Sequence, residues 1–316
     1  MHHDRDAPIP KPLRDWLAGV NEAKRATLSQ GFRLTITGAR EALDTITRRF
    51  VTECPFMPLI RDDVIPGPSY LVPVRIYHPQ PDQALPVALF VHGGGHVAGG
   101  AALYDPIARK LALFARRVVV SVEYRLAPEC PYPAGLQDVM ASAKRVMRLL
   151  SSLNIKHVAR LALVGDSGGG ALCATLAHLS QYDPGLELDQ QVLLYPSLDY
   201  TLSQPSVSAN GEGYLLERDR ILWMFDAYFQ HAENRKEVSP LFMETTERYP
   251  ATLVVTAGFD PLRDEGMAYS ARLKAAGIRC EHVHRPGMVH AFLNLEDLTS
   301  EDCRLTYEAI GDFLSA

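Results

Sequence analysis

Short runs rich in valine and leucine recur along this chain, and stretches with helical periodicity separate most of them. The runs that we expect to form strands are residues 71–78, 87–91, 118–122, 161–164, 191–194, 253–256 and 279–284. Near-continuous apolar strands that alternate with amphipathic helices are typical of a mostly parallel sheet covered by helices on both faces. The sequence therefore predicts an α/β fold. Residues 71–78 alternate apolar and polar side chains, so we expect them at an edge of the sheet.

Two segments fall outside this alternation. Residues 1–55 show helical periodicity, with apolar stripes through Leu13 and Leu17 and through Ala39 and Leu43. The other segment, about residues 200–248, has no convincing strand and is rich in aromatic side chains. It follows a strand end, where α/β folds place their ligands, so we expect a lid over a pocket. An amphipathic helix packed on the core would explain the same stripe. The chain thus divides into a helical segment, 1–55, and a main domain, 56–316, with an insertion at 200–248.

The composition excludes several classes of partner. A formal net charge of −5 offers no basic surface for nucleic acid or anionic lipid, so we expect neither nucleic acid nor membrane as a partner. The five cysteines are scattered and form no Cys-x-x-Cys pair, which favours free, mostly buried thiols in a reducing compartment. The N-terminus lacks the apolar core of a signal peptide, and no segment has the apolar length of a membrane span. We therefore expect a cytoplasmic protein.

A glycine-rich turn follows the predicted strand at 161–164. Residues 165–169 read Gly-Asp-Ser-Gly-Gly, and a helical run from Gly170 to Tyr182 comes next. A Gly-x-Ser-x-Gly turn between a strand and a helix lifts its serine above the sheet. The glycines accept a strained backbone and close neighbours that a side chain would obstruct. Ser167 is therefore the candidate nucleophile, although a serine in an ordinary glycine-rich turn has the same bare pattern.

A serine nucleophile needs a base, and the base needs a carboxylate to orient it. Asp260 follows the strand at 253–256, although it could simply cap the next helix, in which Asp264 lies. His290 follows the last predicted strand, whereas His282 and His284 lie on one face of that strand and are expected to be structural. The order serine, acid, histidine is the order found in α/β hydrolases.

Three glycines follow the strand at 87–91, in the sequence His92, Gly93, Gly94, Gly95. Acyl transfer builds negative charge on a carbonyl oxygen, and backbone N–H groups in such a loop can stabilise it. A flexible turn or a phosphate cradle would also use consecutive glycines. No Gly-Lys-Ser/Thr sequence follows, and the loop does not open a dinucleotide-binding fingerprint, which argues against the cradle.

Together these motifs resemble the hormone-sensitive-lipase family of α/β-hydrolase esterases, over roughly residues 60–316. The matching segments are His92 to Gly95, Tyr124 to Glu129 (Tyr-Arg-Leu-Ala-Pro-Glu), Gly165 to Gly169, Asp260 to Gly266 and Gly287 to Phe292. The resemblance implies an α/β-hydrolase fold with a helical cap made by residues 1–55 and about 200–248.

Position by position, the resemblance implies Ser167 as nucleophile, His290 as general base and then acid, and Asp260 as the orienting carboxylate. It implies an oxyanion hole formed by the N–H groups of Gly94, Gly95 and Gly168, with the His92 side chain bracing the loop. Three positions depart from the family pattern. In Tyr132-Pro133-Ala134, tyrosine replaces the more common phenylalanine, which is a mild change. Gly168 replaces the usual alanine, which would loosen the backbone, and His96 replaces an aromatic residue, which would make the pocket wall more polar.

The resemblance leads us to expect a carboxylic ester hydrolase that acts on a small ester with a short to medium acyl chain and needs no metal or organic cofactor. An amidase, carbamate hydrolase or lactonase could use the same three residues. A non-catalytic small-molecule receptor is a further alternative, but relatives of that kind lack a triad member. The strand at 279–284 is expected at a sheet edge, where it could pair two protomers in a homodimer.

Overall fold

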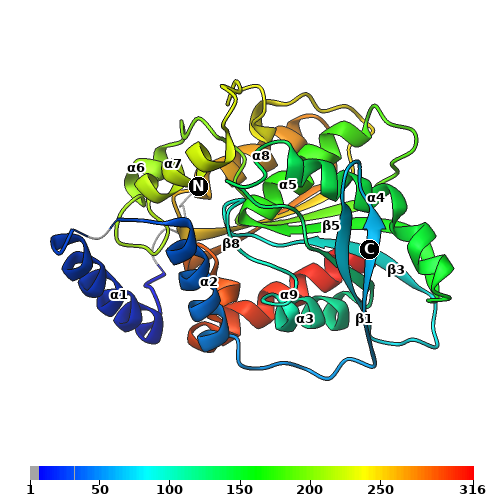
Figure 1. Ribbon diagram of the computed structural model, residues 1–316, viewed down its shortest axis with the longest axis horizontal. Helices are drawn as coiled ribbons and strands as arrows, with labels where there is room; N and C mark the ends of the chain where they lie inside the picture. Colours follow the sequence, from blue (N-terminus) through cyan, green and yellow to red (C-terminus); the bar gives the residue numbers. More distant parts are fainter. Residues whose placement is uncertain (1–6, 32) are drawn as a thin grey trace.

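One eight-stranded sheet forms the centre of the computed structural model, which describes residues 7–31 and 33–316 (Figure 1). The strands are β1 (Leu59–Pro66), β2 (Leu71–His78), β3 (Leu85–Val91), β4 (Val118–Val122), β5 (His157–Asp166), β6 (Gln190–Leu194), β7 (Ala251–Phe259) and β8 (Cys280–Val289). They lie in the order β1-β2-β4-β3-β5-β6-β7-β8. β2 is antiparallel to β1 and β4, and the other neighbouring strands are parallel. The prediction of a mostly parallel sheet is confirmed.

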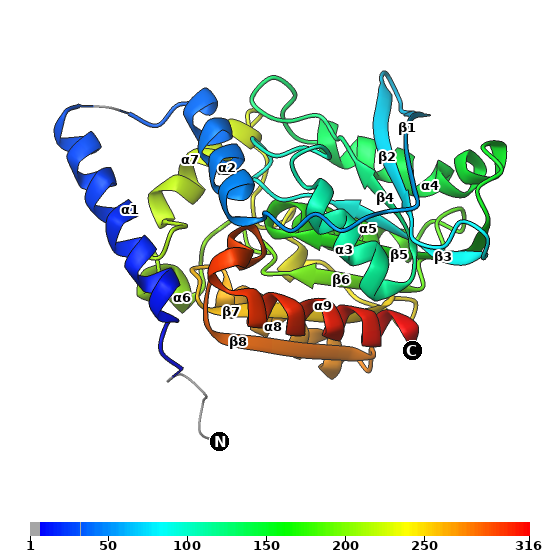
Figure 2. The same cartoon turned by 90° about the horizontal axis from the view of Figure 1, so that it is seen from below.

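Helices cover both faces of the sheet, as the alternation of strands and helices predicts. α4, α5 and α8 pack on one face, and α3 and α9 lie side by side on the other (Figures 1 and 2). The helices are α1 (Lys11–Ser29), α2 (Ile36–Phe50), α3 (Asp105–Ala115), α4 (Ala134–Ser152), α5 (Ser167–Ser180), α6 (Pro205–Ala209), α7 (Arg218–Tyr228), α8 (Arg263–Ala275) and α9 (Ser300–Ser315), with short 3₁₀ helices η1 (Pro240–Phe242) and η2 (Phe292–Leu298).

The central strands are apolar on both faces because both faces are covered. In β4, Val118, Val120 and Val122 belong to the apolar layer under α4 and α5, whereas Val119 belongs to the layer under α3 and α9. All four side chains are at most 1% exposed. Successive side chains of a strand point to opposite faces, so a continuous valine run is the sequence that suits a strand buried on both sides.

The prediction that β2 lies at the sheet edge is wrong, because β1 pairs with it along its full length. Sequence reasoning missed β1, whose segment Leu-Ile-Arg-Asp-Asp-Val-Ile-Pro is mostly exposed and carries three consecutive charges. An edge strand that is mostly exposed to water has no apolar run to reveal it. The prediction of an edge at residues 279–284 is confirmed: β8 is the last strand of the sheet, and it continues to Val289.

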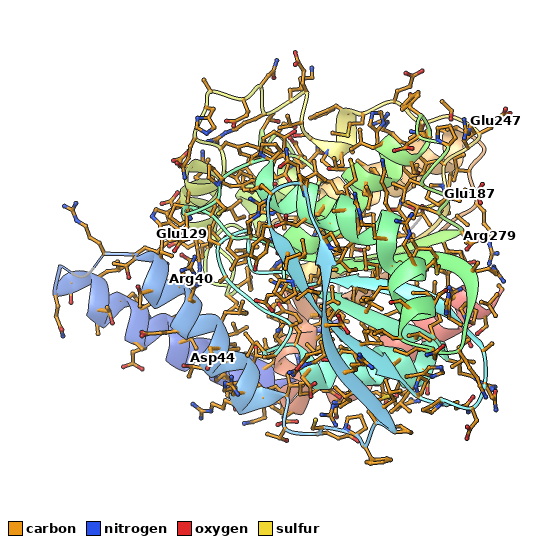
Figure 3. All side chains as sticks on the ribbon, turned by 45° about the vertical axis from the view of Figure 1, so that its right-hand side comes forward. Arg40, Asp44, Glu129, Glu187, Glu247 and Arg279 are labelled. Atoms are coloured by element: carbon orange, nitrogen blue, oxygen red, sulfur yellow. The ribbon has the colours of Figure 1, made fainter. Side chains whose placement is uncertain are left out.

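Both N-terminal helices lie beside the segment between β6 and β7 (Figure 2). In α1, Asn21 donates to the carbonyl oxygen of Gly213 at 2.9 Å, and Lys24 forms an ion pair with Glu217. In α2, the Arg40 guanidinium donates two hydrogen bonds, 2.8 and 2.7 Å long, to the Glu129 carboxylate (Figure 3). Glu129 is the last residue of the Tyr-Arg-Leu-Ala-Pro-Glu segment. These hydrogen bonds therefore connect α2 to the main domain.

No helix in residues 7–31 and 33–316 combines the length and the apolar character that crossing a membrane requires. All five cysteines are free, which confirms the expectation that they form no disulfides. The expectation that most are buried is wrong: Cys173 and Cys303 are buried, Cys130 and Cys280 are half-buried, and Cys54 is exposed.

Candidate active site

Ser167 stands where β5 ends and α5 begins. Its backbone is left-handed, with a φ of 52°, which is strained for a residue with a side chain and persists only where the surroundings enforce it. A Cβ at Gly165 would lie 2.6 Å from the carbonyl oxygen of Gly169, and a Cβ at Gly169 would lie 2.0 Å from that of Val91. Both glycines are therefore required, as the sequence predicts, and α5 starts three residues earlier than expected.

The structure brings Ser167, His290 and Asp260 into one chain of hydrogen bonds. Ser167 Oγ lies 2.8 Å from His290 Nε2, and His290 Nδ1 lies 2.8 Å from Asp260 Oδ2. Because an ionised carboxylate only accepts, Asp260 favours the imidazole tautomer that carries its proton on Nδ1. The lone pair of Nε2 is then directed at the serine hydroxyl. Asp260 is fully buried, whereas Ser167 and His290 remain 8% and 5% exposed. Of the three hydrogen-bonded side chains, solvent and substrate can therefore reach the serine and the histidine.

The ends of three parallel strands position these side chains. Ser167 follows β5, Asp260 follows β7, and His290 follows β8. Asp260 Oδ1 also accepts a hydrogen bond from the Leu262 N–H at 2.8 Å. The alternative that Asp260 caps the next helix is wrong, because Leu262 is the N-cap of α8 and that helix has no side-chain cap. Asp264 instead pairs with Arg263.

The other candidate histidines are structural, as expected. His282 and His284 both contact the Thr256 hydroxyl, at 2.8 and 2.9 Å. Within the described residues, no three His, Cys, Asp or Glu side chains are grouped so that they could hold a metal ion.

The loop after β3 lies against the turn at Ser167. Gly94 and Gly95 have φ angles of 115° and 62°, a region that favours glycine. The Cβ position of Gly168 is 3.4 Å from the amide nitrogen of Gly95, so the three expected N–H donors lie in adjoining segments. In the described residues, neither Gly94 nor Gly95 donates its N–H to a protein acceptor. These amides are therefore free to bind an oxyanion.

His92 lies behind this loop. Its Nδ1 is 2.8 Å from the carbonyl oxygen of Gly93, and its ring stacks on Tyr124 with centroids 4.4 Å apart. Tyr124 in turn donates its hydroxyl to the carbonyl oxygen of His92 at 2.7 Å. The side chain thus contacts the loop that it is expected to brace.

Sequence reasoning missed Asp166 as a residue of the site. Its buried carboxylate accepts a hydrogen bond from the Gly93 N–H at 2.7 Å and another from the Tyr104 hydroxyl at 3.3 Å. Burial raises the pKa of Asp166 to about 7, although the Gly93 N–H opposes the shift. Asp166 therefore connects the turn at Ser167 to the glycine loop by hydrogen bonding. Its position directly before Ser167 is the sequence signal that could have identified it.

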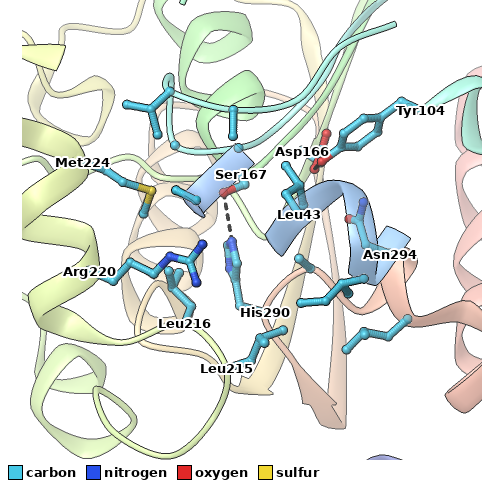
Figure 4. Close-up of a pocket in the computed structure, with 18 residues that line it drawn as sticks. Leu43, Tyr104, Asp166, Ser167, Leu215, Leu216, Arg220, Met224, His290 and Asn294 are labelled. Atoms are coloured by element: carbon cyan, nitrogen blue, oxygen red, sulfur yellow. Dashed lines mark hydrogen bonds between the residues drawn. The ribbon is translucent and has the colours of Figure 1, made fainter. Parts of the chain in front are cut away.

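A cavity of about 720 Å³, including the space open to solvent, lies above Ser167 (Figure 4). Apolar side chains from α2 and from the segment around α7 line it: Ala39, Leu43, Ile46, Leu215, Leu216 and Met224. In α7, Met224 lines the cavity, while Ile221, Phe225 and Tyr228 are buried in an apolar cluster, as expected for an amphipathic helix packed on the core.

A family model described as alpha/beta hydrolase fold matches residues 88–294, which is more than half of the chain. The chain belongs to the α/β-hydrolase family. This α/β hydrolase is 38% identical to carboxylesterase NlhH of Mycobacterium tuberculosis over 233 residues, 71% of this chain and 72% of the relative. It is 34% identical to ethyl acetate hydrolase of Pseudomonas putida over 239 residues, 74% of this chain and 75% of the relative.

A solved structure has the same architecture. The hyperthermophilic esterase of Pyrobaculum calidifontis superposes on this α/β hydrolase with a TM-score of 0.85 at 30% identity, covering 98% of each chain. The resemblance to the hormone-sensitive-lipase type of esterase is thereby confirmed at the level of family and fold.

One expected departure from the family pattern is wrong for this α/β hydrolase. His96 does not line the cavity, so it does not make that wall more polar. Its buried ring stacks on Tyr228 with centroids 3.9 Å apart, and its Nε2 lies 3.2 Å from the Tyr200 hydroxyl. Burial lowers the pKa of His96 to about 3, so the ring is neutral and takes the place of an aromatic side chain.

Alanine is expected to affect stability very differently at the two glycines that follow Ser167. Gly169→Ala is expected to lower the free energy of unfolding by about 3 kcal/mol or more, because its Cβ would overlap the backbone of Val91. Gly168→Ala is the matched control: its Cβ would come no closer than 3.3 Å to the His96 nitrogen, so we expect a change within about 1 kcal/mol. Urea unfolding measures both variants, and equal losses would contradict the prediction.

Proposed function

We propose that this α/β hydrolase cleaves carboxylic esters through an acyl-enzyme, with Ser167 as nucleophile, His290 as proton carrier and Asp260 as the orienting carboxylate. The observation that carries the proposal is the pair of 2.8 Å contacts that links the three side chains at the floor of the cavity. Relatives named carboxylesterase and ethyl acetate hydrolase support an ester over an amide or a lactone.

The geometry suggests the following reaction. Ser167 Oγ attacks the carbonyl carbon while its proton passes to His290 Nε2. The N–H groups of Gly94, Gly95 and Gly168 stabilise the resulting oxyanion, and each such donor is worth about 3 kcal/mol of barrier. His290 then returns the proton to the alkoxide oxygen as the carbon–oxygen bond breaks, and the alcohol leaves. Water attacks the acyl group with the help of His290, which releases the acid and restores the serine hydroxyl.

We further propose that residues 1–55, of which 1–6 and 32 lie outside the described structure, and about 200–248 form a cap over a catalytic domain, residues 56–316. Side chains from both segments line the cavity, and the contacts of Asn21 with Gly213 and of Lys24 with Glu217 join one segment to the other. Such a cap shields the acyl-enzyme from bulk water and limits the length of chain that the pocket accepts.

The size and the mostly apolar lining of the cavity predict a preference for short to medium acyl chains. We expect kcat/KM for p-nitrophenyl esters to rise from acetate through the short chains, because each buried methylene adds about 0.8 kcal/mol, and then to fall for long chains that exceed the cavity. A spectrophotometric series from acetate to palmitate measures the profile. A maximum at palmitate, or no turnover of any ester by folded protein, would contradict the proposal.

We also propose that the protein resides in the cytoplasm, which its free thiols support. In addition, we propose a homodimer paired through β8, which the position of this strand at the sheet edge supports.

A further inference from the structure

An arginine side chain lies on the mostly apolar wall of this cavity. Arg220 lies in the first turn of α7, and Figure 4 shows its guanidinium pointing into the cavity toward His290. Of the described residues that line this cavity, Arg220 alone carries a permanent positive charge. The side chains of two further residues of the cavity wall, Leu215 and Leu216, are hydrocarbon and offer it no acceptor.

The nearby acidic groups are engaged elsewhere. Glu217, whose charge acts on Arg220, forms its ion pair with Lys24 of α1 and accepts the Gly213 N–H at 3.3 Å. Asp166, the acidic residue that lines the cavity, accepts from Gly93 and from Tyr104. Within the described chain, the Arg220 guanidinium makes no hydrogen bond or ion pair.

This position is unfavourable for a cation in the absence of a ligand. Partial burial removes water from the guanidinium and lowers the pKa of Arg220, although not enough to discharge it. The N-terminal turn of a helix carries partial positive charge, so an arginine there is repelled and not stabilised. A carboxylate in the cavity would relieve both costs and could accept two parallel hydrogen bonds from the guanidinium.

We propose that Arg220 binds an anionic group of the substrate, so that the preferred esters carry a carboxylate in addition to the ester that is cleaved. The inference rests on the proposed ester hydrolysis at Ser167 and specifies its substrate class. The carboxylate can belong to the acyl part, as in a half-ester of a dicarboxylic acid, or to the alcohol part, as in an acylated hydroxy acid. In either case the reaction at the ester carbonyl is unchanged.

Two pairs of substrates that differ only in charge test the inference. The p-nitrophenyl half-ester of glutaric acid and its carboxamide counterpart test the acyl part; O-acetyl-lactate and O-acetyl-lactamide test the alcohol part. We expect wild type to show a kcat/KM about tenfold to a hundredfold higher for the carboxylate than for the carboxamide in at least one pair, as is typical of a hydrogen-bonded charge pair. Equal rates in both pairs, or a preference for the carboxamides, would overturn the inference.

Variants of Arg220 assign the preference to this side chain. Arg220→Met keeps the aliphatic stem and removes the charge, and should lower the carboxylate-to-carboxamide ratio by about tenfold or more; Arg220→Lys should retain part of it. The ratio is insensitive to a general loss of folded protein. Arg218→Met is the matched control, because Arg218 lies on the same helix outside the cavity lining, and its ratio should equal that of wild type. A ratio that survives in Arg220→Met would refute the role of Arg220.

A measurement on wild type alone keeps the test independent of any variant. Glutarate should inhibit hydrolysis of p-nitrophenyl acetate competitively and at least about tenfold more strongly than glutaramide, the diamide that has no carboxylate, and equal inhibition would count against the inference. Turnover of p-nitrophenyl acetate itself, with its loss in Ser167→Ala, tests the proposed function separately.

Discussion

Replacing Ser167 with alanine is expected to lower kcat for ester hydrolysis by roughly 10⁴- to 10⁶-fold, because the substitution removes the oxygen that forms the acyl-enzyme. The protein should still fold, since alanine loses only the hydrogen bond from Ser167 Oγ to His290 and the backbone keeps its contacts, such as the Ser197 N–H to the Ser167 carbonyl oxygen at 3.1 Å. Steady-state kinetics with p-nitrophenyl butyrate, and circular dichroism of the same samples, measure both effects.

Ser197 offers a matched serine control near the same turn. It is 4% exposed, and its hydroxyl has no hydrogen-bond partner among the described residues. Ser197→Ala should therefore retain kcat within a factor of about three, since no interaction of the hydroxyl is lost. If Ser167→Ala kept more than about one hundredth of wild-type kcat, the assignment of Ser167 as nucleophile would be wrong.

Replacing Asp260 with asparagine is expected to lower kcat by about 10⁴-fold while leaving the fold intact. Asparagine has the same shape, and its oxygen can still accept the Leu262 N–H that Asp260 Oδ1 accepts at 2.8 Å. Its amide, however, would donate to His290 Nδ1 and so stabilise the tautomer that carries the proton on Nε2. That nitrogen could then no longer accept the proton of Ser167.

Asp264→Asn is the control for this prediction, because Asp264 lies in the same segment but pairs with Arg263 and not with His290. It should retain wild-type kcat within a factor of about two, since it loses only the half-buried ion pair with Arg263 and no contact with His290. Parallel measurements of kcat and of thermal unfolding on both variants distinguish a tautomer effect from a general loss of structure. Similar kcat values for the two variants would refute the role of Asp260.

The sequence predicted the interior strands well and the first edge strand poorly. Strands such as β4 are buried on both sides, so their apolar runs are unmistakable. β1 is exposed and charged, and its pairing with β2 depends on backbone hydrogen bonds that leave no mark on side-chain composition. The same reason explains why β2 was wrongly expected at the edge.

Within the site, the sequence pointed to Ser167, Asp260 and His290 because each follows a strand of a parallel sheet, and the ends of such strands meet at one edge. The structure brings their side chains within hydrogen-bonding distance. Their catalytic roles stay predictions until the variants are measured. Asp166 and Arg220 were missed, because a carboxylate that joins two loops and a cation that faces a cavity are recognisable only from their neighbours in space.

What the amino-acid sequence determined by itself was the local conformation: where strands run, where glycine must stand beside Ser167, and which polar side chains follow strand ends. These features depend on sterics and apolar periodicity over a few neighbouring residues. Only the tertiary structure decided that His96 packs on Tyr228 away from the cavity, and that Arg40 in α2 pairs with Glu129. It also decided that Arg220 faces the cavity and makes no ion pair with any residue that the structure describes. Burial and charge pairing depend on residues far apart in the chain, and no local pattern encodes which of them meet.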